Sequence, residues 1–164
     1  MSDAIVLPSL SRWTKNHLTA IIQAKSASAL NASLDAFLFK DAVITVNGRN
    51  ITRAEFTTLL GAEKLDETTA SISFTGAVEV PANPKSHENA GSVGVFFTAT
   101  IAQAIIIQGA PVEHWLTASI NVVIEQDESL PPPPHGIKGF TDRRRAVTPQ
   151  QQRILTVRDR LWFK

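Results

Sequence analysis

The stretch that decides the fold runs from Asp41 to Leu60 and reads DAVITVNGRNITRAEFTTLL. Its first part, Ala42 to Val46, is a short apolar run typical of a strand. Asn47-Gly48 then suits a type I′ turn, because both central residues of that turn need a positive φ. We therefore expect the chain to reverse sharply here, with residues 50–51 pairing back briefly against the first strand.

A helix is predicted immediately after this hairpin. Thr52 and Glu55 have the spacing of a capping box, in which the threonine hydroxyl accepts a hydrogen bond from a first-turn amide and the glutamate reaches back. Phe56, Leu59 and Leu60 then give the helix one apolar face. The twenty residues thus turn the chain and start a helix that can cover a sheet.

Two further helices are expected upstream. Residues 9–30 have a helical period, and Ser9 or Ser11 could cap its start. The apolar side of this first helix is formed by Leu10, Trp13, Leu18, Ile21 and Ile22. A shorter second helix follows, with its apolar edge at Leu34, Phe37 and Leu38.

From Ser71 onward the apolar period changes to two, which predicts four long strands. The first is expected to turn one apolar face inward through Ile72, Phe74, Gly76, Val78 and Val80. The second covers residues 93–108, with Val95, Phe97, Ala99 and Ile101 on one face. The third covers residues 114–125, with Leu116, Ala118, Ile120, Val122 and Ile124 on one face. The last covers residues 153–163.

Helices followed by a run of strands predict an α+β fold with helices on one face of an antiparallel sheet. Gly76, Gly94 and Ala99 lie inside strands, where small residues permit bending. We expect a strongly curved, cone-shaped sheet whose hollow side is closed by the N-terminal helices to form a pocket. Residues 1–164 are expected to be one domain, with an exposed proline-rich loop at about 127–141.

Composition narrows the function classes. The chain of 164 residues is 43% hydrophobic and 19% charged, which is typical of a globular protein. A net charge of +1 gives no field that would recruit nucleic acid or an anionic membrane. The absence of cysteine excludes a disulfide scaffold, a thiolate zinc site and a cysteine nucleophile. No secretory signal or membrane span is visible, so we expect a cytoplasmic protein.

The order of these elements resembles the nuclear transport factor 2-like superfamily, which includes SnoaL-like cyclases, ketosteroid isomerase and scytalone dehydratase and has a cystatin-like fold. The resemblance runs from about Leu10 to Phe163. It is carried by the long first helix, Phe37-x-x-x-Asp41-Ala42, the strand with Asn47-Gly48, the Thr52–Phe56 helix start and the four long strands. It implies a cone-shaped sheet, a pocket between sheet and helices, and often a homodimer packed sheet to sheet.

The resemblance does not carry a reaction with it, because members of this superfamily include isomerases, dehydratases, cyclases and binding proteins. The isomerase base is an aspartate late in the first strand, and that place falls here on Thr45 or Val46. The isomerase oxyanion tyrosine and the dehydratase tyrosines have no counterpart, since the chain contains no tyrosine. Those two chemistries are therefore not expected.

Trp13 and His17 are four residues apart on the first helix and so share a face. If that face lines the pocket, both residues could bind a ligand and His17 could act as an acid or base. The alternative is a packing residue beside a surface histidine.

His114 and Trp115 follow a Gly-Ala-Pro turn and point to opposite faces of a strand, so at most one of them enters the pocket. The alternative is that they form an exposed strand end.

Asn121 interrupts an apolar strand and marks either the pocket or the solvent side of the sheet. Asp159 shares the predicted face of Leu155, Val157 and Leu161, where a carboxylate would have a raised pKa and could serve as a base. A cross-strand ion pair with a neighbouring arginine is the commoner use of such a residue.

Arg143-Arg144-Arg145 could grip a phosphate, or it could be a solvated charged turn. The PPPPHG stretch could present a polyproline II ligand or act as a stiff linker. The four histidines are scattered without ligand spacing, so no metal site is expected. No dinucleotide or phosphate-loop fingerprint is present either, and we expect no cofactor.

Two functions remain open. The first is binding of a small apolar molecule between sheet and helices, with or without lyase or isomerase-type acid–base chemistry. The second is a non-catalytic, dimeric protein-interaction module. It is suggested by the proline loop and by the strand from Ile101 to Ile107, which is apolar on both faces and needs a cover for its second face.

Overall fold

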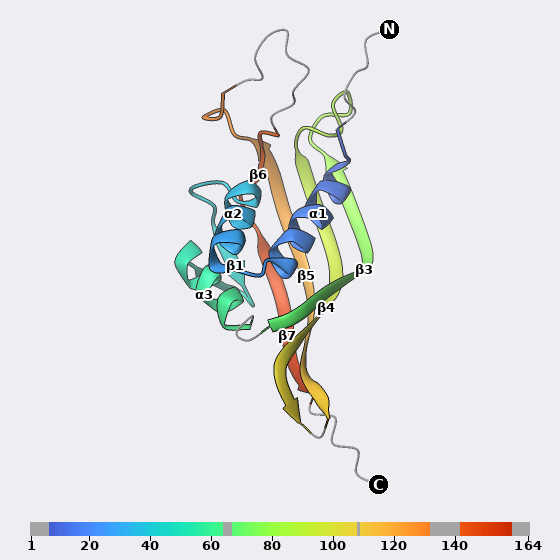
Figure 1. Cartoon of the computed structure of the whole chain (residues 1–164). Helices are drawn as coiled ribbons and strands as arrows, with labels where there is room; N and C mark the ends of the chain where they lie inside the picture. Colours follow the sequence, from blue (N-terminus) through green and yellow to red (C-terminus); the bar gives the residue numbers. More distant parts are fainter. Residues whose placement is uncertain (1–6, 64–66, 108, 132–141, 159–164) are drawn as a thin grey trace, which may run out of the picture.

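A helical layer packs on one strongly curved sheet in the computed structural model, which describes residues 7–63, 67–107, 109–131 and 142–158 (Figure 1). The helices are α1 (Leu10–Gln23), α2 (Ala27–Phe37) and α3 (Arg53–Glu63). The strands are β1 (Ile44–Val46), β2 (Arg49–Ile51), β3 (Glu67–Pro81), β4 (Gly91–Ile107), β5 (Ala110–Gln126), β6 (Arg144–Ala146) and β7 (Gln150–Arg158). The predicted α+β architecture is confirmed.

The two N-terminal helices are started by serine caps. Ser9 Oγ accepts a hydrogen bond from Arg12 N at 3.3 Å, and Ser26 Oγ accepts one from Ala29 N at 3.1 Å. The second cap explains why the prediction of one helix over residues 9–30 is wrong at its end. The chain leaves the helix after Gln23 and begins α2 at Ala27.

The decisive stretch folds as its residues predict. Asn47 and Gly48 have φ values of 49° and 78°, and residues 44–46 pair antiparallel with residues 49–51. Thr52 Oγ1 accepts a hydrogen bond from Glu55 N at 3.1 Å, while Thr52 N donates to Glu55 Oε2 at 2.6 Å. The capping box therefore starts α3, which leads the chain onto the inner side of the sheet.

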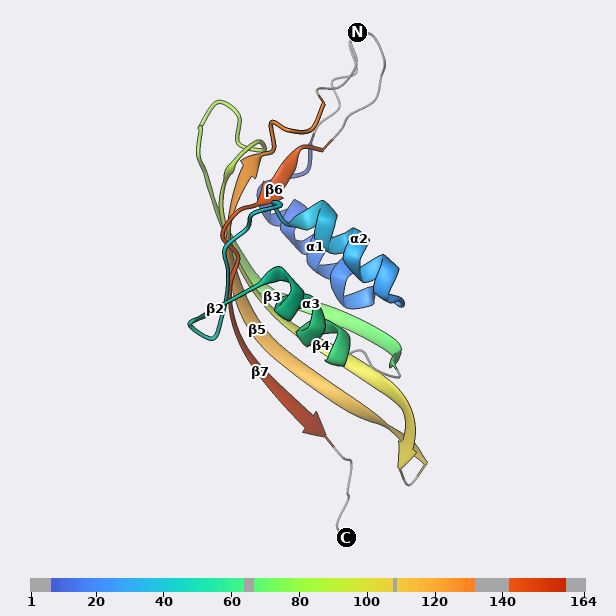
Figure 2. The same ribbon diagram turned by 90° about the vertical axis from the view of Figure 1, so that its left-hand side faces the viewer.

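The sheet has the strand order β2-β1-β7-β5-β4-β3, and β6 pairs with the end of β5. Every pairing is antiparallel except that of β1 with β7, which is parallel. Figure 2 shows the bent sheet in profile, with the helices on its concave side and the β4–β5 hairpin extending beyond them. We call the concave side the inner face and the convex side the outer face.

The prediction for the first long strand is correct in its lower half and wrong in its upper half. Ile72 and Phe74 pair with Ala99 and Phe97 on the inner face. A β-bulge between Phe74 and Gly76 then shifts the register by one residue. As a result, Val78 and Val80 lie on the outer face, where 61% and 62% of their surface is exposed. One extra residue moves every following side chain to the other face.

Candidate functional site

Side chains of the described residues fill much of the space between helices and sheet. Buried residues from β4 and β5, including Phe97, Leu116 and Ile120, meet the apolar faces of the helices there. A cavity of about 20 Å³ lies there, lined by Phe56 and Leu60 of α3 and by Gln151 of β7 among other residues. Such a volume holds about one water molecule. Pockets for drug-sized ligands are larger, at roughly 300–1,000 Å³.

Gln151 is the polar residue of this cavity. The residue is 5% exposed, and its Oε1 has no hydrogen-bond partner within the described part of the chain. A buried acceptor without a partner costs roughly 1–3 kcal/mol. The cavity therefore offers a single hydrogen-bond acceptor inside apolar walls. The sequence interpretation missed Gln151, because a run of three glutamines does not indicate which of them faces inward.

Trp13 and His17 share one face of α1, as their spacing predicts, and they pack with Phe37 of α2. The ring centroids of Trp13 and His17 are 4.4 Å apart, and those of His17 and Phe37 are 5.7 Å apart. Burial lowers the pKa of His17 to about 4, although the nearby Asp142 carboxylate opposes this change. His17 is therefore neutral near pH 7 and can exchange hydrogen bonds without carrying charge.

A buried arginine lies beside this aromatic group. Arg144 is 1% exposed, and its guanidinium carbon is 5.5 Å from the centroid of the Trp13 ring. Its Nε and Nη2 donate to the two carboxylate oxygens of Asp142 at 3.0 and 2.8 Å. Its Nη1 donates to the carbonyls of Pro8 and Glu88 at 2.8 and 3.0 Å. Burial acts to raise the pKa of Asp142, yet the hydrogen bonds and charge of Arg144 hold it below its usual value.

This arrangement corrects both interpretations for Arg144. Arg144 is neither a solvated residue nor a free phosphate ligand, because its donors are used inside the protein. Arg143 and Arg145 also donate to backbone carbonyls, those of Asp127 and of Asp142 and Arg144 respectively. The segment therefore ties β6 to the start of α1 and to the β3–β4 connection.

His114 and Trp115 point to opposite faces of β5, as predicted. His114 lies across from the buried Ile101 on the inner face, and its Nδ1 is buried without a hydrogen-bond partner among the described residues. Trp115 lies on the outer face, where its Nε1 donates to Glu113 Oε2 at 3.3 Å. Trp115 therefore does not line the space between helices and sheet.

The structure does not gather the proposed catalytic residues into one site. His17 lies near Arg144, and Arg144 pairs with Gln126 at one end of β5. His114 lies near the other end of β5, twelve residues from Gln126. That span is about 40 Å for an extended strand. Asp159 lies outside the described residues, as does most of the proline-rich loop. The described part of the chain thus contains no assembled acid–base pair of these residues.

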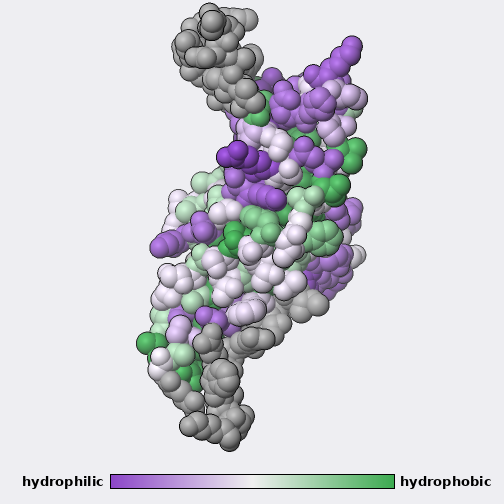
Figure 3. Space-filling view, turned by 90° about the vertical axis from the view of Figure 1, so that its right-hand side faces the viewer, coloured by the Kyte–Doolittle hydropathy of each residue, from purple (hydrophilic) through white to green (hydrophobic). Residues whose placement is uncertain are grey.

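The outer face of the sheet carries several exposed apolar side chains. Val78, Val80, Phe96 and Val123 are exposed there on three neighbouring strands. Figure 3, seen from the β3 edge, shows apolar side chains on this side of the molecule and again near its lower end. In the β4–β5 hairpin, Ile105, Ile106 and Ile107 are also exposed. Isolated exposed apolar residues are ordinary, but a contiguous group indicates an interaction surface.

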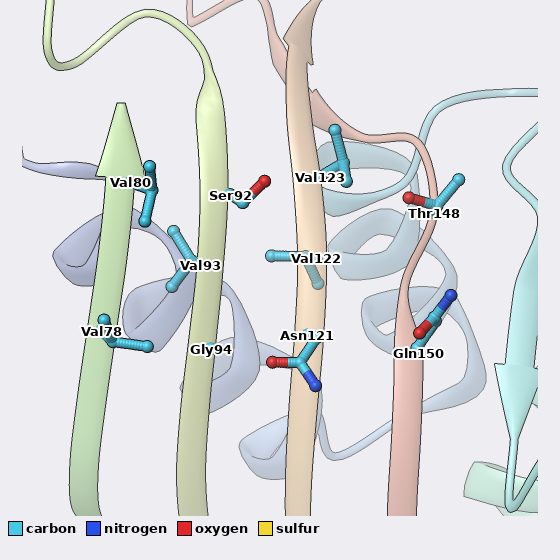
Figure 4. Close-up of a pocket in the computed structure, with 10 residues that line it drawn as sticks. All are labelled: Val78, Val80, Ser92, Val93, Gly94, Asn121, Val122, Val123, Thr148 and Gln150. Carbon is cyan, nitrogen blue, oxygen red and sulfur yellow. The ribbon is translucent and has the colours of Figure 1, made fainter. Parts of the chain in front are cut away.

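Asn121 belongs to this outer face and not to the interior. It pairs with Gly94 across the β4–β5 ladder, and it borders a shallow hollow of about 250 Å³. In Figure 4 its amide oxygen is directed toward Gly94, with Val78 and Val80 on the far side. The hollow is open to solvent, and its rim also carries Ser92, Val123, Thr148 and Gln150.

Two further site classes, a metal centre and a membrane-spanning helix, can be compared with the described residues. No group of three or more histidine, aspartate or glutamate side chains is placed to hold a metal ion in this part of the chain. Within the same residues, no helix has both the length and the apolar character needed to span a bilayer.

Comparison with solved structures assigns the fold. A protein described as a scytalone dehydratase, from Novosphingobium aromaticivorans, matches with a TM-score of 0.58 and 9% identity over 90% of this chain and 84% of its own. A hexachlorocyclohexane dehydrochlorinase matches with a TM-score of 0.54 and 10% identity, covering 94% and 96%. The Candida albicans Mtr2–Mex67 M domain complex matches with a TM-score of 0.53 and 14% identity, covering 92% and 95%.

The chain has the nuclear transport factor 2-like fold. Its neighbours include both enzymes and a protein complex, so this fold does not select between chemistry and binding. No known family model matches the sequence, and no curated protein matches it. The function of this nuclear transport factor 2-like chain therefore has to be argued from its own surfaces.

Proposed function

We propose that the chain is a non-catalytic binding module that pairs with a second copy of itself through the outer face of the sheet. The observation that carries this proposal is the contrast between the small cavity beneath α3 and the exposed apolar side chains of Val78, Val80, Phe96 and Val123. Exposed apolar surface on a sheet is stabilised when another surface covers it, at roughly 25 cal/mol for each Å² buried.

The distribution of charge favours a second copy of this chain as the surface that covers the outer face. The outward positions from Ser92 to Thr100 on β4, and from Trp115 to Val123 on β5, carry no charged side chain. A two-fold pairing places identical surfaces against each other, so any charge near the centre would meet a like charge. The uncharged centre of this face avoids that repulsion, while Glu113 and Glu125 lie beyond its two ends.

The available area reaches the lower limit for a specific interface. Nine residues of β4, from Ser92 to Thr100, span roughly 30 Å, and the four long strands are roughly 19 Å wide together. Covering this rectangle on two copies buries roughly 1,100 Å², counting both surfaces. Specific interfaces begin at about 1,000 Å².

Sedimentation velocity at micromolar concentration tests this proposal. We expect a dimer for the natural chain and a monomer for Val78→Glu, because the variant buries an unpaired carboxylate at the interface. Ala32→Glu is the matched control, since it adds the same charge at an exposed position on α2. A natural chain that sediments as a monomer would refute the proposal.

A second candidate function is binding of a small apolar molecule with one hydrogen-bond donor in the cavity beneath α3. The partnerless Gln151 Oε1 supports it, because a ligand donor would satisfy that acceptor. Entry requires α3 to shift, since the cavity is about 20 Å³. His17 could then add acid–base chemistry of the lyase or isomerase type near the ligand.

A thermal-shift panel of small apolar alcohols and phenols tests this candidate. A ligand at one hundred times its Kd stabilises a protein by about 2.7 kcal/mol. We expect Gln151→Leu to abolish the shift if the acceptor binds the ligand. A flat response across the panel for the natural chain would argue for the binding module alone.

A further inference from the structure

A second hollow lies on the outer face of the sheet, on the side of Phe96 away from Gly94. It has a volume of about 390 Å³ and is open to solvent. Small-molecule sites occupy roughly 300–1,000 Å³, so this hollow is large enough for one, unlike the cavity beneath α3. The outward side chains at its border come from four strands and are Thr75, Phe96, Thr98, Thr117, Ser119 and Gln152.

The floor of this hollow is backbone. Phe97, Ala118 and Arg153 also border it, and they pair with one another across β4, β5 and β7. Cross-strand partners point to the same face of a sheet, and Phe97 and Ala118 belong to the buried core. The side chains of this row are therefore directed inward, which leaves the outward residues as the wall.

Phe96, Thr98, Thr117 and Ser119 form the corners of a rectangle in this wall. Phe96 pairs with Ser119, and Thr98 pairs with Thr117. Neighbouring strands lie about 4.8 Å apart, and alternate residues of one strand lie about 6.8 Å apart. One aromatic ring, which is 56% exposed at Phe96, therefore stands beside three hydroxyl groups. Gln152 continues the row beyond Ser119.

The polar groups of the wall are available to a ligand. Thr98, Thr117, Ser119 and Gln152 make no side-chain hydrogen bond within the described part of the chain, whereas Thr75 Oγ1 donates to Phe96 O at 3.4 Å. A hydroxyl or a carboxamide can both donate and accept a hydrogen bond. The hollow thus offers donors and acceptors together, next to an aromatic surface.

This combination selects one class of ligand. A purely apolar molecule would remove water from the hydroxyls without replacing its hydrogen bonds. A charged molecule would find no opposite charge, because the outward positions of β4 and β5 that border the hollow are uncharged. A neutral saccharide has hydroxyls that donate and accept, and its C–H bonds, polarised by neighbouring oxygens, are attracted to the negative face of an aromatic ring.

We propose that this hollow binds a neutral oligosaccharide, with one hexose ring against Phe96 and hydrogen bonds to Thr98, Thr117, Ser119 and Gln152. The inference goes beyond the proposed pairing of two copies and does not rest on it. Phe96 belongs to both surfaces, so a saccharide and a second copy compete for the same ring.

NMR chemical-shift mapping with cellotriose, maltotriose and mannotriose tests this site. The natural chain and Val78→Glu are both titrated, so that pairing of two copies cannot hide the hollow. We expect saturable shifts at the residues that border the hollow with at least one of these sugars. Phe96→Ala should weaken binding by about 10-fold, and Phe96→Trp should restore it. Thr117→Val, which removes a hydroxyl and keeps the shape, should weaken binding by about 3-fold.

Thr69→Val is the matched control, because it makes the same change at an exposed position on the outer face of β3, outside the hollow. It should bind as the natural chain does, and circular dichroism establishes that each variant is folded. Titrations without shifts in either protein would overturn this inference and leave the pairing of two copies intact. Equal losses in Thr69→Val and Thr117→Val, or shifts confined to the helices, would also overturn it. A natural chain that is a monomer but shows the expected shifts would refute the pairing alone.

Discussion

Phe96 and Phe97 are neighbours on β4, yet 56% of Phe96 is exposed and only 2% of Phe97. Phe97 meets the helices on the inner face, and Phe96 has only solvent above it within the described chain. The inner positions of β4 and β5 are aliphatic or aromatic, whereas most outer positions are serine, threonine, glycine or asparagine, with Phe96 and Val123 among them. Three helices pack against the inner side, while Val78, Val80, Phe96 and Val123 of the outer side remain exposed among the described residues. The outer face is therefore where we place the function.

The largest expected effect comes from the pair of phenylalanines itself. Phe97→Ala should lower the free energy of unfolding by about 3–5 kcal/mol, because it leaves a cavity in a packed core. Phe96→Ala should change the stability of the monomer by no more than about 0.5 kcal/mol. Urea denaturation at low protein concentration measures both. Equal effects would show that the two faces do not differ in the way described.

The next effect tests how the helical layer is held on the inner face. Arg144→Ala should lower the free energy of unfolding by about 2–4 kcal/mol, because it leaves two carbonyls and the Asp142 carboxylate without their donor. The partial exposure of Asp142 allows water to reach it and reduces the loss. Arg12→Ala, an exposed position on α1, is the control and should be nearly neutral in the same denaturation experiment.

A smaller effect depends on pH. His17 titrates near 4 in the folded chain and near 6.5 when unfolded, so the unfolded chain binds more protons between these values. The free energy of unfolding therefore keeps the full contribution of neutral, buried His17 above about pH 6.5. It falls as the pH is lowered toward 4, because protonation of His17 then favours the unfolded chain. Because the side chain is only partly buried, we expect a loss of about 1–2 kcal/mol between pH 7 and pH 4.5.

The groups that face His17 shape this response, and they are Asp142, Arg144 and Arg145. In the variant His17→Gln, the fall in stability between pH 7 and pH 4.5 should largely disappear when unfolding is followed by denaturant titration at each pH. A His17→Gln profile that parallels the natural one would assign the acid sensitivity to other residues.

The smallest effect concerns the start of α3. Thr52→Ala should cost about 1 kcal/mol, because it removes the hydroxyl that accepts the hydrogen bond from Glu55 N. Thr58→Ala is the control, since that residue lies on an exposed part of the same helix and caps nothing. Melting temperatures of the two variants, compared at equal protein concentration, distinguish loss of a cap from loss of any threonine.

Local patterns predicted much of the fold. The Asn47-Gly48 turn, the Thr52–Glu55 capping box and the inward alternation of β4 and β5 are all present, because each depends on residues close together in sequence. The parallel pairing of β1 with β7 was not predicted, since it joins segments about a hundred residues apart. The break after Gln23 was missed because the helical period continues through it.

The surfaces were less predictable than the elements. Arg144 was interpreted as a solvated or ligand-binding residue, because its partners at Pro8 and Glu88 lie 136 and 56 residues away. Asn121 could be assigned to either face, and only the ladder with Gly94 places it outside. The small volume of the cavity beneath α3 was also not predicted, since the periodicity of a helix or strand shows which side is apolar and not how closely two sides meet.

The bulge between Phe74 and Gly76 makes the exposed side of β3 sensitive to the insertion or deletion of one residue. A single codon there determines whether the valines of the upper half of β3 join the core or the surface. Loss of that codon would send Glu79 outward, away from the amide of Ser11 that it now binds, and would press two valines against α1. The surface that we propose for self-recognition could therefore arise or vanish in one mutational step, without any change in the residues that compose it.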